Sequence, residues 1–231
     1  MPLKWELLEA EFIDRPNRFL TRVNYNGEVV KSHLPDPGRL KELLIPGVTL
    51  LIKKEGNPNR KTKFSTQGVY LDGQLISLNS WLPNEFVEFL LKNKSIHFLE
   101  GWDFIRREVP FGKNRFDFLL MRDEKPLYLE VKSVTLVENG VAKFPDAVTE
   151  RGKRHVEHLA KMTKDGVECM VLFVVQRPDA KIFQPQWERD PQFSEALLKA
   201  YNDGIKVKVI QAEMQKTKMV YFGELPFTLK S

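Results

Sequence analysis

The sequence predicts an α/β protein in two parts, a small β-barrel followed by a mixed sheet flanked by helices. Three observations support this fold class. Residues 1–80 contain five segments of strand character and a single short helical segment. After Ser80 the pattern changes to helices that alternate with strands. Residues 169–175 form a continuous apolar run, which is typical of a strand covered on both faces.

The first part, residues 1–80, is predicted to be an OB-like β-barrel domain. The expected strands are residues 8–23 with a bend at Pro16-Asn17, 28–34, 48–54, 63–71 and 74–78. The dipeptide Asp72-Gly73 between the last two favours a tight hairpin turn. Residues 39–44 are expected to form the short helix, which ends before Pro46-Gly47. Five strands in so short a segment can close into one barrel.

The second part, residues 81–231, is predicted to contain the mixed sheet. Its first helix begins near Leu82, because apolar residues follow at helical spacing. The other expected helices are 147–164 and 193–202, and the expected strands are 105–111, 115–120, 127–132, 170–176, 205–211 and 219–222. This order of elements gives a central sheet with helices on its faces.

The charge and the cysteine content limit the class of protein. The formal net charge of +5 suits a polyanionic partner such as nucleic acid, without requiring one. The single cysteine, Cys169, excludes an intrachain disulfide. The N-terminus lacks the apolar core of a signal peptide, and no apolar stretch approaches the length of a membrane span. We therefore expect a cytoplasmic protein that does not act at a membrane.

The hairpin of residues 115–132 carries the candidate chemistry. Side chains alternate between the faces of a strand, so Glu130 and Lys132 share a face, and Asp117 on the preceding strand can lie beside them. Two adjacent carboxylates repel unless a cation lies between them. The pattern predicts a site for Mg²⁺ or Mn²⁺ that cleaves phosphodiesters, with Lys132 orienting a water molecule. The alternative is an amphipathic hairpin whose charges are simply solvated.

Basic residues of the first part are candidates for contact with a nucleic-acid backbone. They are Arg15, Arg18, Arg22, Arg39, Arg60 and Lys61. Phe19 and Phe64 could stack on bases, although core positions are expected for both. In the helix of residues 147–164, Arg151, His155 and His158 follow one edge. We expect this edge to border the paired acids, with Arg151 contacting phosphate or an acid; the alternative is an ordinary surface edge.

Three longer motifs resemble the sugar fermentation stimulation protein A family. They are residues 116–120 (FDFLL), residues 128–137 (YLEVKSVTLV) and residues 144–152 (FPDAVTERG), and residues 16–20 and 36–47 agree with the same family. The resemblance covers nearly the whole chain. It implies an OB-like N-terminal domain, a PD-(D/E)xK nuclease-like C-terminal domain, DNA binding and an association with sugar utilisation.

The resemblance also implies roles for individual residues. Asp117 and Glu130 match the metal ligands, and Lys132 matches the catalytic lysine. Nucleases of this fold often add a further acid, for which Glu85, Glu88 and Glu108 are candidates here, and Glu108 is preferred.

We therefore expect a DNA-binding protein with a metal-dependent phosphodiesterase site and little sequence specificity. One rival is a nonspecific DNA-binding regulator of sugar metabolism whose nuclease site is idle. Another is an OB module for oligosaccharides, which the scattered tryptophans do not favour. The choice between DNA and RNA, and between single and double strands, is left open by the residues.

Overall fold

A computed structural model describes residues 1–112 and 114–230 of the protein. These residues form two compact units. The first comprises Met1–Leu82 together with Glu213–Val220, and the second comprises Pro83–Ala212 and the residues from Tyr221 onward. The predicted division into residues 1–80 and 81–231 stays a prediction. The two units are not consecutive in sequence, because Glu213–Val220 groups with the first unit.

The first unit is built on a closed barrel. Its strands are β1 (Leu8–Asn17), β2 (Leu20–Tyr25), β3 (Glu28–His33), β4 (Thr49–Lys54), β5 (Phe64–Leu71) and β6 (Gln74–Ser77). The first five follow the order β3-β2-β1-β4-β5, and β3 pairs with β5 to close the ring. Apolar side chains that alternate along these strands fill the interior, among them Phe12, Val23 and Val69. The predicted OB-like barrel is confirmed, but the predicted strand 8–23 is two strands, β1 and β2, and the predicted strand 74–78 is β6, which pairs with β5 outside the closed ring.

The predicted helix at residues 39–44 is wrong. The segment instead forms two hydrogen-bonded turns, in which Leu43 and Leu44 both donate their backbone N–H to the carbonyl of Leu40. Leu40 has a φ of 51°, in the left-handed region, and a right-handed helix cannot start through such a residue. Leu40 and Leu43 are both fully buried, so core packing determines this conformation.

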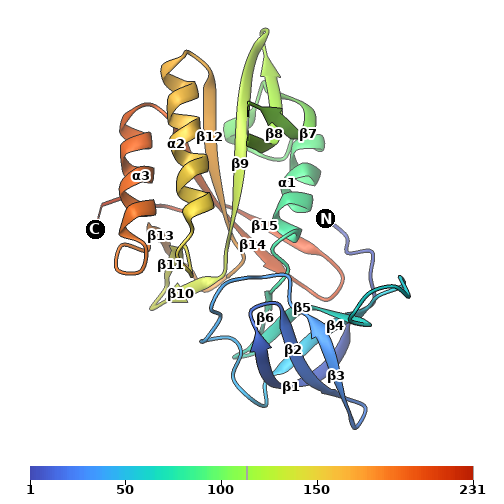
Figure 1. The fold of residues 1–231 in the computed structure, drawn as a ribbon. Coiled ribbons are helices and arrows are strands. Elements are labelled where there is room, and N and C mark those ends of the chain that lie inside the picture. Colours follow the sequence, from blue (N-terminus) through green and yellow to red (C-terminus); the bar gives the residue numbers. More distant parts are fainter. Residues whose placement is uncertain (113, 231) are drawn as a thin grey trace. The chain divides into compact units, whose positions relative to one another are not determined.

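The second unit contains a six-stranded mixed sheet in the order β15-β14-β12-β9-β8-β7 (Figure 1). Its strands are β7 (Asp103–Phe111), β8 (Asn114–Arg122), β9 (Lys125–Val134), β12 (Glu168–Val175), β14 (Lys206–Met214) and β15 (Met219–Glu224). The helices are α1 (Leu82–Lys92), η1 (His97–Leu99), α2 (Glu150–Lys164) and α3 (Pro191–Asn202). In Figure 1, α2 and α3 lie side by side, and α2 packs along β12. The predicted mixed sheet flanked by helices is confirmed.

A second, three-stranded sheet was not predicted. It consists of β10 (Leu136–Glu138), β11 (Val141–Phe144) and β13 (Ile182–Pro185), in that order. The chain passes from its middle strand into α2. No helix among the described residues is long and apolar enough to cross a membrane.

One buried acid fixes the start of both long helices. Asp190 caps α3, because its Oδ1 accepts the backbone N–H of Phe193 at 3.1 Å. Its Oδ2 accepts the N–H of Thr149 at 2.8 Å, and the Thr149 hydroxyl in turn accepts the N–H of Gly152 to cap α2. This chain of hydrogen bonds determines where α2, and therefore His155, lies on the sheet.

Candidate active site

The candidate site lies where β8 and β9 separate. The antiparallel pairing of the two strands runs as far as Phe118 opposite Leu129. Beyond that point Asp117 accepts the backbone N–H of Val131 with its side chain, at 2.7 Å from Oδ2. The carboxylate thus replaces the backbone carbonyl that would accept this N–H in a regular sheet. It lies close enough to Glu130 for the charge of Glu130 to raise its pKa.

Asp117 is partly buried, and its environment disfavours the charged form. Burial, and after it the neighbouring charge of Glu130, raise its pKa to about 6. Two donors oppose this effect: the N–H of Val131, and the side-chain amide of Asn84, whose Nδ2 donates to Asp117 Oδ1 at 2.7 Å. Asn84 belongs to the first turn of α1, so this helix orients the carboxylate.

Glu130 is only 4% exposed and is held in its charged form. Its Oε1 accepts from Lys132 Nζ at 2.6 Å and from His155 Nδ1 at 2.7 Å. Burial pushes the pKa of this carboxyl up, but the Lys132 ammonium and the hydrogen bond from His155 outweigh it, and the pKa lies below its usual value.

The second oxygen of Glu130 provides a test of the predicted metal site. Oε2 is buried, and it has no hydrogen-bond partner among the residues that the structure describes. A buried carboxylate oxygen without a partner is costly unless a donor or cation completes it. Hard divalent cations bind such oxygens. The donor set around Asp117 and Glu130 therefore fits a divalent ion.

The third predicted ligand, Glu108, lies on β7 between Arg107 and Val109, which pair with Phe118 and Phe116 on either side of Asp117, and its role as a ligand stays a prediction. Its carboxylate is exposed and lies 3.4 Å from Arg115 Nη1. The alternative Glu88 pairs with Lys92 at 2.6 Å and with Arg107 at 2.8 Å. Within residues 1–112 and 114–230, no group of three or more His, Cys, Asp or Glu side chains is arranged to hold a metal. The site thus offers two carboxylates and the amide of Asn84.

Two domain models match the chain over most of its length. One, described as the SfsA N-terminal OB domain, matches residues 13–78. The other, described as the sugar fermentation stimulation protein RE domain, matches residues 81–218. The chain belongs to the sugar fermentation stimulation protein family. The matched segments carry both the barrel and the three residues Asp117, Glu130 and Lys132.

Relatives in this family match along nearly their full length. A homolog from Clostridium tetani is 43% identical over 217 residues, which is 94% of each chain. A homolog from Clostridium novyi is 45% identical over 202 residues, covering 87% of this chain and 88% of the relative. The structure of Pyrococcus furiosus SfsA in complex with Ca²⁺ superposes with a TM-score of 0.91 at 28% identity, over 99% of this chain and 98% of that one.

The predicted phosphate-binding residues of the barrel differ in their surroundings. Arg22 forms an ion pair with Asp14, and Arg60 lies 3.6 Å from Glu55. Arg15 donates to the backbone carbonyls of Arg18 and Arg39, both at 2.7 Å. Arg15 therefore has a structural role. Arg18, Arg39 and Lys61 are exposed.

The predicted edge of α2 meets the site through one of its three residues. His155 is buried and contacts Glu130. His158 instead contacts the side chain of Asn114 and packs against Phe111. Arg151 is exposed and lies one helical turn before His155. Whether Arg151 contacts a phosphate stays a prediction.

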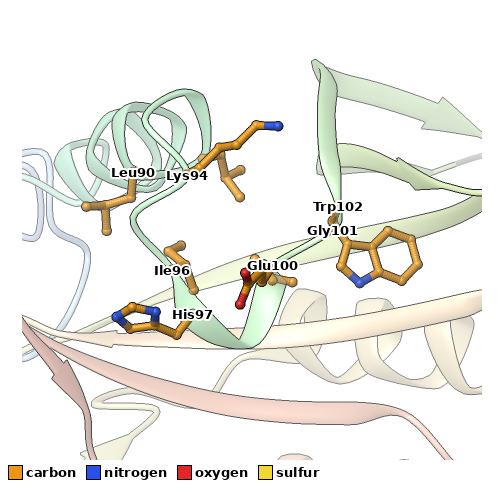
Figure 2. A pocket seen from close by; sticks show the side chains of 9 residues that line it. Leu90, Lys94, Ile96, His97, Glu100, Gly101 and Trp102 are labelled. Carbon is orange, nitrogen blue, oxygen red and sulfur yellow. The ribbon is translucent and has the colours of Figure 1, made fainter.

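A separate hollow of about 290 Å³ lies at the other end of α1 (Figure 2). It is lined by Leu90, Leu91, Lys94, Ile96, His97, Leu99, Glu100, Gly101 and Trp102. None of these residues belongs to the Asp117 site. Figure 2 shows the Trp102 ring turned away from the other lining side chains, and Arg122 lies over that ring, 4.5 Å from its centroid.

One residue of the candidate site was not predicted from the sequence, and the burial expected for another residue was wrong. Asn84 was considered only as the start of a helix, because an isolated amide carries no chemical signal of its own. Phe19 was expected in the core, yet its side chain is 48% exposed, whereas Phe64 is buried as expected. The position of Phe19 in a turn next to Asn17 was the available signal: such turns lie on the surface.

Proposed function

We propose that this protein is a divalent-metal-dependent phosphodiesterase that cleaves nucleic acid with little sequence preference, in the manner of PD-(D/E)xK nucleases. The observation that carries the proposal is the buried Glu130 Oε2, without a partner among the described residues, beside Asp117 and Lys132. The Ca²⁺ complex of the Pyrococcus furiosus relative supports a divalent ion. Mg²⁺ and Mn²⁺ are the proposed activating ions, because both bind carboxylates and phosphate oxygens.

Asp117 and Glu130 would hold the ion. When bound, it supplies Lewis-acid polarisation of the phosphate and stabilises the developing negative charge. We propose Asn84 as the third protein group in place of Glu108, since an asparagine carbonyl is a suitable oxygen ligand. Such ligation requires the amide of Asn84 to turn over, so that its oxygen rather than its nitrogen faces Asp117.

The remaining residues position these groups. His155 donates Nδ1–H to Glu130 and so fixes the orientation of this carboxylate. Lys132 makes a 2.6 Å contact with the same oxygen, which holds its ammonium group at the site. From there Lys132 orients the attacking water and stabilises negative charge on the phosphate oxygens.

The partner is proposed to be DNA, bound chiefly through its phosphate backbone. The exposed Arg18, Arg39, Lys61 and Arg151 are the proposed contacts, because backbone contacts position a nucleic acid without reading its sequence. A cytoplasmic location is proposed with it. The rival function is a nonspecific DNA-binding regulator of sugar metabolism with an idle site, which the family name favours.

Cleavage of labelled DNA and RNA in Mn²⁺, compared with the same reactions in EDTA, tests the proposal. Wild type should cut in Mn²⁺ and not in EDTA. Lys132→Ala should lose turnover by about 100-fold or more while it still binds the ion, because lysine is not a ligand. DNA binding should survive in this variant. If wild type cuts no single- or double-stranded substrate with either Mn²⁺ or Mg²⁺, the nuclease function is wrong and the regulator takes its place.

A further inference from the structure

An exposed aromatic ring and two exposed arginines lie on neighbouring loops of the barrel. Phe19 is 48% exposed and follows Arg18 in the turn between β1 and β2. Arg39 comes from the longer loop between β3 and β4. The two loops are far apart in sequence, and the side chain of Arg15 brings them together through its bonds to the carbonyls of Arg18 and Arg39.

This arrangement is held by hydrogen bonds on both loops. The side chain of Asn17 accepts the N–H of Phe19 at 2.9 Å, and the carbonyl of Phe19 accepts the N–H of Leu34 at 2.9 Å. In the second loop, Asp36 Oδ1 accepts the N–H of Gly38 at 2.7 Å. Because the backbone is fixed at these points, the protein would lose little conformational entropy when a ligand binds here.

The charges at this position are available to a ligand. Among the described residues, the side chains of Arg18 and Arg39 form no ion pair or hydrogen bond with a protein group. Arg22 and Arg60 of the same barrel differ, since each already pairs with a carboxylate. The exposed ring and the two arginines therefore form one surface, which we call the Phe19 surface.

We propose that the Phe19 surface binds single-stranded nucleic acid, with a base stacked on Phe19 and the flanking phosphates on Arg18 and Arg39. An exposed ring on a loop next to two exposed arginines provides the two interactions that single strands use, stacking and backbone attraction. In a duplex the base faces are already stacked on one another, so the ring would contribute little. The inference rests on the proposed function and defines its substrate as a strand with unpaired bases.

Fluorescence anisotropy tests this with a labelled dT20 oligonucleotide and a 20-base-pair duplex of mixed sequence, each titrated with the full-length protein in EDTA. Phe19→Ala and Phe19→Leu should each weaken dT20 binding by roughly tenfold or more, because one stacked base is lost. Phe19→Trp should restore it. Duplex affinity should change by less than about twofold in all three variants, because a duplex offers no unstacked base to the ring at position 19. Thermal unfolding checks that each variant is folded.

Arginine variants test the phosphate contacts. Arg18→Gln and Arg39→Gln should each reduce the slope of log affinity for dT20 against log salt by about 0.7, the value for one phosphate of a single strand. Arg22→Gln is the matched control, because its charge is already paired with Asp14, and it should change the slope by much less.

The outcomes separate this inference from the proposed function. Wild-type dT20 affinity in Phe19→Ala, or an equal loss of duplex binding, would overturn the inference even if the protein cleaves DNA. Conversely, dT20 binding that depends on Phe19 in a protein that never cleaves would uphold the inference and overturn the nuclease.

Discussion

Asp117 and Glu130 are adjacent acids with opposite effects on stability. From the sequence the two are equivalent, because each is an acid that repels the other. In the structure their hydrogen bonds differ. Glu130 accepts hydrogen bonds from Lys132 and His155, whereas Asp117 accepts them only from the neutral amides of Val131 and Asn84. The pKa of Asp117 is accordingly raised and that of Glu130 lowered.

Asp117→Asn should stabilise the metal-free protein at neutral pH. Because the pKa of Asp117 rises from 3.8 to about 6 on folding, its ionised form destabilises the fold, and stability is lost as pH increases between those values. An amide resembles the protonated acid, so the difference between variant and wild type should grow over that range to on the order of 1–3 kcal/mol. Urea unfolding in EDTA at pH 4.5 and pH 8 measures it. A difference that does not grow with pH would contradict the account.

Glu130→Gln should have the opposite effect. Since its folded pKa is depressed, Glu130 contributes stability above its usual pKa of 4.5, and this contribution is lost as the pH falls below that value. Removing the charge leaves Lys132 without its buried partner, so the free energy of unfolding at pH 7 should fall by about 3 kcal/mol. The same urea series measures it, and equal stability of variant and wild type would show that the pair is not formed.

At the level of elements, Asp190 links the starts of α2 and α3. Asp190→Ala removes the cap of α3 and the acceptor of the Thr149 N–H, so unfolding should become easier by about 2 kcal/mol. The N-terminal turn of α2 should also lose amide protection in hydrogen exchange. As a control, Asp165→Ala at the other end of α2 removes no side-chain cap and should change stability by less than about 0.5 kcal/mol.

The elements also show how far the sequence could predict this protein. Alternation along residues 115–132 and the helical spacing of Leu159 and Met162 gave the hairpin and α2, because each pattern repeats over several residues. The sheet β10-β11-β13 was missed because its strands have only 3 to 4 residues and one pairing is long-range. The contact of Asn84 with Asp117 joins residues 33 apart, which no local pattern could reveal.

At the scale of the whole molecule, the two units do not follow the order of the chain, because the first unit includes a segment from late in the sequence. The first unit contains Glu213–Val220, whose residue Thr217 accepts the backbone N–H of Leu3 at 2.8 Å. Proteolytic cleavage between residues 79 and 84 should therefore leave the two pieces together in native size-exclusion chromatography and separate them only in denaturant. Free release of an N-terminal fragment under native conditions would contradict this division of the chain.

Nucleic-acid binding by the whole molecule should depend on salt rather than on sequence. With basic side chains as the proposed contacts, log affinity should fall linearly with log salt, by similar amounts for unrelated DNA sequences. Anisotropy titrations between about 50 and 200 mM salt, a range over which several phosphate contacts give a large loss, would show this. An affinity that is insensitive to salt, or a strong preference for one sequence, would argue against backbone binding.

The central claim is that Asp117 and Glu130 together hold a divalent ion, and calorimetric titration with Mn²⁺ tests it most directly. Wild type should bind one ion, Lys132→Ala should bind it with similar stoichiometry, and Asp117→Asn and Glu130→Gln should each lose most of the binding heat. Folding of each variant is checked by circular dichroism on the same samples. The account is contradicted if wild type binds no Mn²⁺ with or without DNA, or if Asp117→Asn and Glu130→Gln bind it as wild type does.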